Sequence, residues 1–238
     1  MELKSFGCSF IFGSDLSDYC NVNKEHKTHK AHATIPSQLT WPAILSSQLG
    51  YDYQCHARPG AGNLIISDII LNHLVSDKSA LYVIGWSWID RFDYTNSSIS
   101  RFKADIIWKN WKTLRPESES DLAKTYYQGL HSEYRDKLTS LLSIKTVIDV
   151  LKQKELPFIM TYMDELLFDR THNTTPAIVT LQDYVRPYMT MFEEKTFLDW
   201  SRNHGYPESA GWHPLEQAHA EGAKVMRQAF DRQNTNVR

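Results

Sequence analysis

A strand pattern near the N-terminus reads Glu2-Leu3-Lys4-Ser5-Phe6, and Gly7-Cys8-Ser9-Phe10 follows it directly. A glycine after a strand allows a sharp turn of the backbone, which places Ser9 at the edge of the sheet where the strand ends. Open α/β sheets bind ligands in the crevice beyond that edge, and a serine hydroxyl there can act as a nucleophile. The alternative for Ser9 is a turn or N-capping serine.

Further strand patterns follow along the chain and alternate with helical ones. Strands are expected at 51–57, 80–84 and 157–162, and helices at about 40–49, 64–74 and 130–154 and from Pro214 onward. This alternation predicts a parallel sheet joined by right-handed crossovers. We therefore expect an α/β fold, a three-layer α/β/α sandwich with a parallel, flavodoxin-like sheet of about five strands.

Composition narrows the class of protein. The chain has 238 residues, enough for one large α/β domain, and 26 basic against 28 acidic residues give a formal net charge of −2. With so small a net charge, no strong electrostatic field is expected to attract the protein to nucleic acid or anionic lipid. No apolar run in the sequence is long enough to span a bilayer. The first residues lack a signal-peptide pattern, and Cys8, Cys20 and Cys55 have no metal-like spacing, so we expect free thiols in a cytoplasmic protein.

The second strand ends in the turn Gly60-Ala61-Gly62-Asn63. Its glycines can turn backbone N–H groups toward a developing oxyanion, and the Asn63 side chain can add a donor. The alternative is a flexible turn in which Asn63 caps the next helix. The two roles do not exclude each other.

The third strand is followed by Gly85-Trp86-Ser87-Trp88. Ser87 can donate a hydrogen bond into the same crevice. Trp86 and Trp88 can stack on a sugar or an acyl chain, although core packing explains them equally well.

The last block is Trp212-His213-Pro214, ahead of the final helix. A proline in the first helical turn fixes the helix start, so His213 is expected on the loop just before it. Histidine is a suitable general base at neutral pH. A capping or buried structural histidine is the alternative.

These four blocks, in this order, make the sequence resemble the SGNH (GDSL-like) hydrolase superfamily, and most of all proteins whose first block reads Phe-Gly-Cys-Ser-Phe, as residues 6–10 do. The resemblance implies that Ser9 is the nucleophile and His213 its base. It places the N–H groups of Ser9 and Gly62 in the oxyanion hole, with Gly60 as a near rival, and it makes His219 structural.

Two positions depart from the pattern of the superfamily. Ser87 stands where an asparagine donates to the oxyanion, so Asn63 would have to substitute. Ala210 stands where an aspartate usually precedes the histidine by three residues. Glu208, Asp199 or a backbone carbonyl would then orient His213, or a Ser–His dyad would operate alone.

The resemblance implies hydrolysis or transfer of an acyl group carried as an ester, and a small acyl group on a carbohydrate is the preferred substrate. No metal or organic cofactor is implied. Gly60, Trp86, Trp88 and Trp212 are the expected substrate contacts. The main rival, favoured by Ala210 and Ser87, keeps the fold but only binds a glycan or glycolipid. The oligomeric state stays open.

Other segments carry weaker signals. His26, His29 and His32 are read as a solvated surface rather than a metal site. Asp164-Glu165 is expected to cap a helix, and residues 102–114 to form a lid, an oligomer contact or a packed helix. One domain is expected over 1–238, with inserted segments at about 95–128 and 163–205 on its substrate side.

Overall fold

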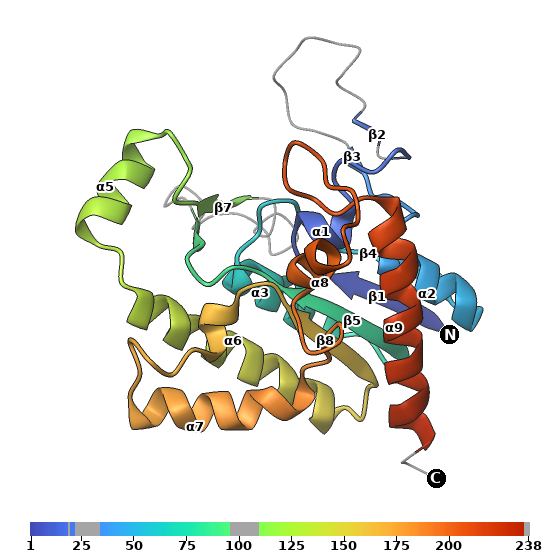
Figure 1. Cartoon of the computed structure of the whole chain (residues 1–238). Coiled ribbons are helices and arrows are strands. Elements are labelled where there is room, and N and C mark those ends of the chain that lie inside the picture. The colour runs from blue at the N-terminus through green and yellow to red at the C-terminus, as the bar shows by residue number, and fades with distance from the viewer. Residues whose placement is uncertain (19, 22–33, 96–109, 236–238) are drawn as a thin grey trace.

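The central sheet of the computed structural model contains four parallel strands, β1 (Glu2–Phe6), β4 (Asp52–Cys55), β5 (Ala80–Trp86) and β8 (Phe158–Tyr162), in the order β4-β1-β5-β8 (Figure 1). The structure describes residues 1–18, 20–21, 34–95 and 110–235. About five strands were expected. Within the described residues the fifth position holds a single parallel bridge from Met160 to Met189 instead of a full strand.

Strand β5 shows why the sheet is covered on both faces. Its register pairs Leu81 with Leu3 of β1 and Val83 with Ile159 of β8. Alternate side chains enter opposite hydrophobic clusters, Leu81 and Val83 on one side and Tyr82 on the other. A strand buried on both faces reads as a continuous apolar run, which is the pattern that predicted it.

Helices cover the sheet as two layers, so the three-layer expectation is confirmed (Figure 1). One layer contains α3 (Asn63–Leu74), α6 (Glu133–Gln153) and α7 (Pro176–Val185). The other contains α2 (Trp41–Leu49), α8 (Phe197–Asn203) and α9 (Glu216–Thr235). The short helix α1 (Ser9–Phe12) packs with the second layer.

Local signals explain where these helices begin and end. Thr40 caps α2 by accepting the Ala43 N–H, and Gly50 ends it with a left-handed φ of 68°. The start of α9 differs from the expectation because Pro214 forms an isolated bridge with Glu208. The helix therefore begins two residues later, at Glu216.

An antiparallel hairpin beside the sheet is the main element that the sequence did not predict. It joins β6 (Phe92–Thr95) to β7 (Trp111–Leu114), with Asp93 opposite Thr113, and α5 (Asp121–Gly129) follows. Residues 102–109 of the proposed lid segment, like His26, His29 and His32, lie outside the described residues. A two-residue pair, β2 (Cys20–Asn21) with β3 (Thr34–Ile35), completes the strands that the structure describes.

The 163–205 segment packs into the body of the protein. Its 3₁₀ turns η3 (Glu165–Phe168) and η4 (Arg186–Tyr188) flank α7, which packs on α6. Phe192 and Trp200 pack in the cluster that contains Met226 of α9. This segment was expected on the substrate side; its buried side chains, among them Phe192 and Trp200, belong to the core, and the rest of the segment is partly or fully exposed.

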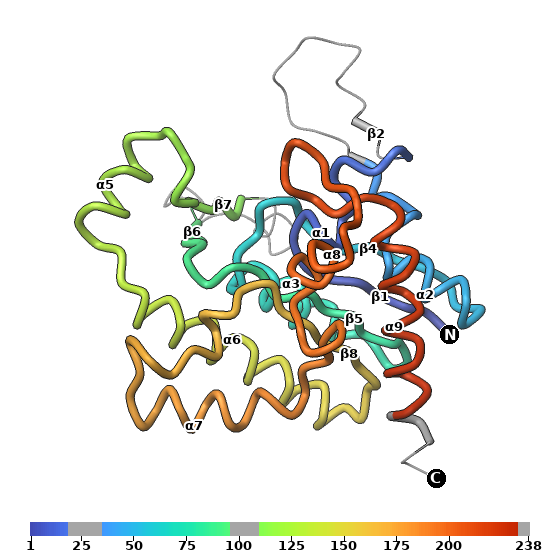
Figure 2. The backbone as a smooth tube through the Cα atoms, viewed as in Figure 1, coloured from blue at the N-terminus to red at the C-terminus, as the bar shows by residue number. Residues whose placement is uncertain are grey.

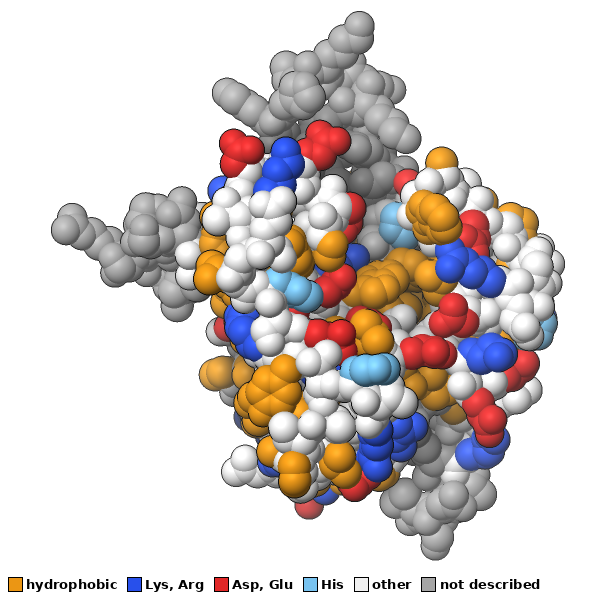
Figure 3. All heavy atoms as spheres, turned by 60° about the vertical axis from the view of Figure 1, so that its left-hand side comes forward, with side chains coloured by type: hydrophobic (Ala, Val, Ile, Leu, Met, Phe, Trp, Pro, Cys, Tyr) orange, Lys and Arg blue, Asp and Glu red, His pale blue; other side chains and the backbone are white. Residues whose placement is uncertain are grey.

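The surface carries mixed charge. On the face in Figure 3, acidic and basic side chains are interspersed around a hollow that has hydrophobic side chains on its floor. In the described part of the chain, no helix combines the length and apolar character needed to cross a membrane. The same residues contain no cluster of metal-ligating side chains, and Cys8 and Cys55 are free thiols.

Candidate active site

The turn after β1 places Ser9 at the carboxyl edge of the sheet. A Cβ on Gly7 would lie 2.5 Å from Ile11 Cγ1 and 2.8 Å from the Gly85 carbonyl oxygen, and its φ is 156°. Only glycine fits so close an approach between β1 and β5. Helix α1 begins at once with Ser9 and ends at Gly13, so the serine is held on a short, rigid turn.

Three side chains meet at this edge. His213 Nε2 lies 2.9 Å from Ser9 Oγ, and His213 Nδ1 lies 2.7 Å from Asp15 Oδ2. The carboxylate can only accept, so Nδ1 carries the ring proton and Nε2 accepts the hydrogen bond of the Ser9 hydroxyl. Figure 2 shows the two chain segments involved, the blue segment that holds α1 and the orange-red loop before α9.

Ser209 holds this arrangement together. Its hydroxyl donates to Asp15 Oδ2 at 2.8 Å and accepts the His213 N–H at 3.2 Å, while its own N–H donates to the His213 carbonyl at 2.9 Å. Asp15 and Trp212 both have left-handed backbones, with φ of 73° and 66°. Such conformations are strained for residues other than glycine and recur at functional sites, where surrounding contacts hold them in place.

Asp15 is the carboxylate partner of His213 that the sequence analysis did not predict. Of the expected candidates, Glu208 pairs with Arg202 at 2.8 Å, and Asp199 is hydrogen-bonded to Thr196 at the start of α8. Neither orients His213. The available signal was weak, an aspartate just after Gly13 in a polar stretch, and aspartate tolerates left-handed conformations better than most residues.

Two of the donors expected in the oxyanion hole, Gly62 and Asn63, donate to partners within the protein. The Gly62 N–H donates to Asp93 Oδ1 at 3.1 Å. The Asn63 amide donates to the Ser87 carbonyl at 3.1 Å and to Ser140 Oγ at 3.0 Å, and its oxygen accepts the Ser87 N–H at 2.7 Å. The Ser87 hydroxyl is buried, without a hydrogen-bond partner among the described residues.

The Asp93 carboxylate holds the turn at Gly62 by hydrogen bonds. Besides the Gly62 N–H, its carboxylate accepts the Ile65 N–H at 3.0 Å and the Thr113 hydroxyl at 2.7 Å. Burial raises the pKa of this carboxyl, against the lowering effect of the three hydrogen bonds. The hairpin thus caps helix α3 from outside, a role that no sequence signal identified.

A pocket of about 430 Å³ opens over Ser9. Its lining residues are Ser9, Ser14, Arg58, Pro59, Gly60, Thr113, Arg115 and His213. The N–H groups of Ser9 and Gly60 have no acceptor among the residues that the structure describes. Gly62, Asn63 and Ser87 do not line this pocket, so the rival position, Gly60, is better placed than the expected one.

The tryptophans expected to contact substrate lie in three different environments. Trp86 is fully buried in the core, because β5 extends two residues beyond its expected end, and this correction removes it from the site. Trp88 is half-buried, 5.3 Å from the Phe10 ring centroid. Trp212, next to His213, is 67% exposed, with the Arg202 guanidinium 5.3 Å from its ring centroid.

His219 has a structural role, as the resemblance implied. It is buried on α9, and its Nδ1 accepts the Trp41 N–H at 3.1 Å. Burial lowers its pKa to about 3, so the ring is neutral at physiological pH.

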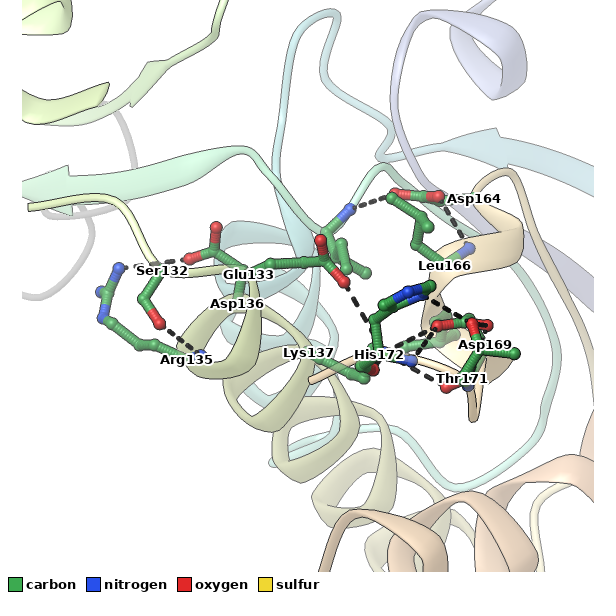
Figure 4. Close-up of polar contacts among 12 residues, drawn as sticks. Ser132, Glu133, Arg135, Asp136, Lys137, Asp164, Leu166, Asp169, Thr171 and His172 are labelled. Atoms are coloured by element: carbon green, nitrogen blue, oxygen red, sulfur yellow. Dashed lines mark hydrogen bonds and ion pairs between the residues drawn. The ribbon is translucent and has the colours of Figure 1, made fainter. Parts of the chain in front are cut away.

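A second polar cluster lies at the N-terminal end of α6 (Figure 4). Asp164 accepts the Leu166 N–H at 3.0 Å and so caps η3, as expected, and it also accepts the Ile89 N–H at 3.0 Å. Lys137, fully buried, donates to the carbonyl oxygens of Asp169 and His172 at 3.1 and 3.0 Å. These contacts hold loops together and lie apart from the pocket over Ser9.

Comparison with known proteins supports the fold. No protein-family model and no curated protein matches the chain. Among solved structures, a lipolytic protein of the G-D-S-L family from Veillonella parvula is similar over 98% of this chain and 99% of its own, with 14% identity and a TM-score of 0.51. The acetyl xylan esterase Est2A from Butyrivibrio proteoclasticus gives 11% identity and a TM-score of 0.51, over 98% of this chain and 64% of its own.

A carbohydrate esterase family 2 enzyme from Corynascus thermopiles is similar at 13% identity and a TM-score of 0.50, over 96% of this chain and 64% of its own. This chain therefore spans about two thirds of the length of the two carbohydrate esterases. At such identities the similarity establishes the fold, an α/β fold of the GDSL-like hydrolase type.

Proposed function

We propose that the protein is a serine esterase of the SGNH type, which uses Ser9, His213 and Asp15 as a catalytic triad. The observation that carries the proposal is the continuous contact from Ser9 Oγ to His213 Nε2 and from His213 Nδ1 to Asp15, at 2.9 and 2.7 Å. Nucleophile, base and orienting acid are the three groups that acyl transfer by serine requires. The esterases among its structural neighbours favour the same chemistry.

In the proposed reaction Ser9 Oγ attacks the ester carbonyl while His213 Nε2 takes the hydroxyl proton. Asp15 stabilises the imidazolium that forms. The tetrahedral intermediate then collapses, the C–O bond to the alcohol breaks, and His213 gives its proton to the departing alkoxide. Water repeats these steps on the acyl-enzyme and releases the acid and free Ser9.

For the oxyanion we propose the N–H groups of Ser9 and Gly60, since both residues line the pocket over the nucleophile. The loss of one such donor costs roughly 10²–10³ in turnover. Gly62, Asn63 and Ser87 fit this role less well, because the first two donate within the protein and the third is buried.

Asp15 also weakens the rival interpretation, a glycan-binding protein without catalysis. That interpretation was favoured by Ala210, because an alanine stands where the superfamily usually has the aspartate that orients the histidine. The contact from Asp15 to His213 supplies one from another loop. An acetylated carbohydrate remains the proposed substrate type, with support from two structural neighbours, an acetyl xylan esterase and a carbohydrate esterase. We retain one domain over 1–238 and a cytoplasmic location, with which free Cys8 and Cys55 are compatible.

The test is covalent labelling by a fluorophosphonate, followed by intact mass, together with hydrolysis of aryl acetates. We expect stoichiometric labelling that Ser9→Ala abolishes. Ser17→Ala is a matched control, because Ser17 lies on the loop after α1 with an exposed side chain outside the pocket. Folded wild-type protein that neither labels nor hydrolyses would favour the binding protein. Adding an acceptor alcohol separates hydrolase from transferase by the product formed.

A further inference from the structure

The lining of the pocket over Ser9 is strongly one-sided in charge. It contains two arginines, Arg58 and Arg115, and no carboxylate among the described residues. The described part of its lining also contains no Phe, Tyr or Trp side chain, although a sugar-stacking platform was expected from the tryptophans. The two arginines therefore give the described part of the pocket wall a positive charge.

Arg58 is a positioned group. It follows β4 in the turn that leads to Gly60, and its side chain is half-buried. Its Nη2 donates to the Trp111 carbonyl at 2.5 Å, which ties the guanidinium to strand β7. Burial lowers the pKa of Arg58, an effect that Asp93 opposes, yet arginine stays charged in proteins. A cation that has already lost part of its hydration can bind an anion at low additional desolvation cost.

Arg115 reaches the pocket from the other chain segment, one residue after β7. Its Nη1 lies 3.3 Å from Glu117 Oε1, and the two side chains are 43% and 63% exposed. Ion pairs so exposed contribute little to stability. A better-placed anion in the pocket can therefore replace Glu117 as the partner of Arg115.

Two carboxylates of the described residues that contact the site or its neighbouring turn, Asp15 and Asp93, are engaged elsewhere. Asp15 binds His213 and Ser209, and Asp93 accepts two backbone N–H groups and a hydroxyl. Neither lines the pocket. Among the described residues, the lining therefore contains two arginines and no carboxylate, although the charge of Asp93 also acts on Arg58.

We propose that the substrate of the Ser9 site is an ester that carries an anionic group, a carboxylate or a phosphate, which Arg58 and Arg115 bind beside the scissile bond. This inference rests on the proposed esterase function and specifies its substrate class. The planar guanidinium fork matches the oxygens of both groups. Arg58 supplies most of the recognition because it is the more buried and the better anchored of the two.

Binding to Ser9→Ala protein tests the inference without turnover. Two matched ester pairs are compared by calorimetry, 3-carboxyphenyl acetate with 3-carbamoylphenyl acetate and phenyl hydrogen succinate with phenyl succinamate. The anion lies in the alcohol half of the first pair and in the acyl half of the second. We expect the anionic member of at least one pair to bind roughly 10- to 100-fold more tightly, the range for hydrogen bonds to charged groups.

Arginine variants in the same background assign the effect. Arg58→Met should remove most of the preference, and Arg115→Met should reduce it by roughly 2- to 5-fold, as befits an exposed ion pair. Arg58→Lys keeps the positive charge but not the guanidinium fork, so its preference for the anionic ester should be intermediate. Because this variant also changes the contact with the Trp111 carbonyl, it shows whether a loss in Arg58→Met comes from the charge or from that contact. Arg170→Met removes an equal charge from the α7 side of the molecule, where Arg170 pairs with Asp183, and should leave the preference unchanged.

The outcomes separate the two proposals. Equal binding within both pairs, or a preference that survives in the Arg58→Met/Arg115→Met protein, overturns the anionic substrate. Hydrolysis of neutral esters by wild type would then leave the esterase standing. An anion preference without hydrolysis or labelling supports the binding inference and overturns the esterase.

Discussion

Replacing Asp15 by asparagine isolates the charge of the proposed triad acid. An amide oxygen in place of Oδ2 can still accept from Ser209 Oγ and from His213 Nδ1, so the ring keeps its tautomer and orientation. What the variant loses is the attraction between a carboxylate and the imidazolium that forms as Ser9 attacks. Asp15→Ala loses the orientation as well.

The magnitude follows from the geometry. Charges about 4 Å apart attract by about 1 kcal/mol in water and about 4 kcal/mol at an effective dielectric constant of about 20. Asp15 and His213 have side chains 44% and 19% exposed, so the site lies between these limits. A loss of about 1–3 kcal/mol slows the attack roughly 5- to 150-fold for Asp15→Asn. Asp15→Ala should be slower by about a further tenfold, because the ring is no longer held.

The rate constant of fluorophosphonate labelling measures this effect without knowledge of the natural substrate. Glu208→Gln is the matched control, since it removes a carboxylate from the same loop as His213, one that pairs with Arg202. We expect its labelling rate to equal that of wild type. If Asp15→Asn labels within about twofold of wild type, the acid role of Asp15 is refuted and a Ser–His dyad is the better description.

Three further predictions concern the surroundings of the site. Ser87→Ala removes a buried hydroxyl that lacks a partner among the described residues, so the free energy of unfolding should be unchanged or rise by up to about 1 kcal/mol. The labelling rate should be unchanged. A roughly tenfold slower labelling rate would instead indicate that Ser87 donates to the oxyanion. Gly62→Ala places a Cβ 2.6 Å from Asp93 Oδ2 and should lower the free energy of unfolding in urea by about 1–3 kcal/mol. Gly129→Ala is the control, because its Cβ would have nothing within 4 Å, and it should not lower that free energy. If the two variants unfold at the same urea midpoint, the close packing of Gly62 on Asp93 is contradicted. Burial lowers the pKa of His56 to about 4, below its value in the unfolded chain, so the unfolded state binds the proton first as the pH falls. The free energy of unfolding should therefore be highest above about pH 6.5 and should fall by roughly 1–2 kcal/mol, after allowance for partial exposure, as the pH drops toward 4. Thermal melts at several pH values should show this loss in wild type and not in His56→Gln.

The sequence predicted those parts of the molecule that depend on local patterns. Ser9 and His213 were identified because each stands beside a recognisable boundary, the end of β1 for one and the approach to α9 for the other. The core strands were visible because burial on both faces demands continuous apolar residues, as in β5. These signals need no knowledge of distant contacts.

The missed features depend on contacts between distant segments. Asp15 contacts His213 only because the fold brings together two loops whose residues lie 198 positions apart. Asp93 and Thr113 form a cap for α3 only once the hairpin has paired. Trp86 was misplaced for a simpler reason, since a tryptophan at a strand end reads equally well as the last core residue or the first loop residue.

The close spacing of Ser9 and Asp15 has a consequence for the newly made protein. The proposed nucleophile and acid leave the ribosome almost together, whereas the proposed base follows only after nearly two hundred more residues have been added. A nascent chain therefore carries Ser9 without its proposed base until these residues have been added. In the proposed mechanism, Ser9 becomes reactive only after the loop before α9 has emerged and brought His213 into contact with it.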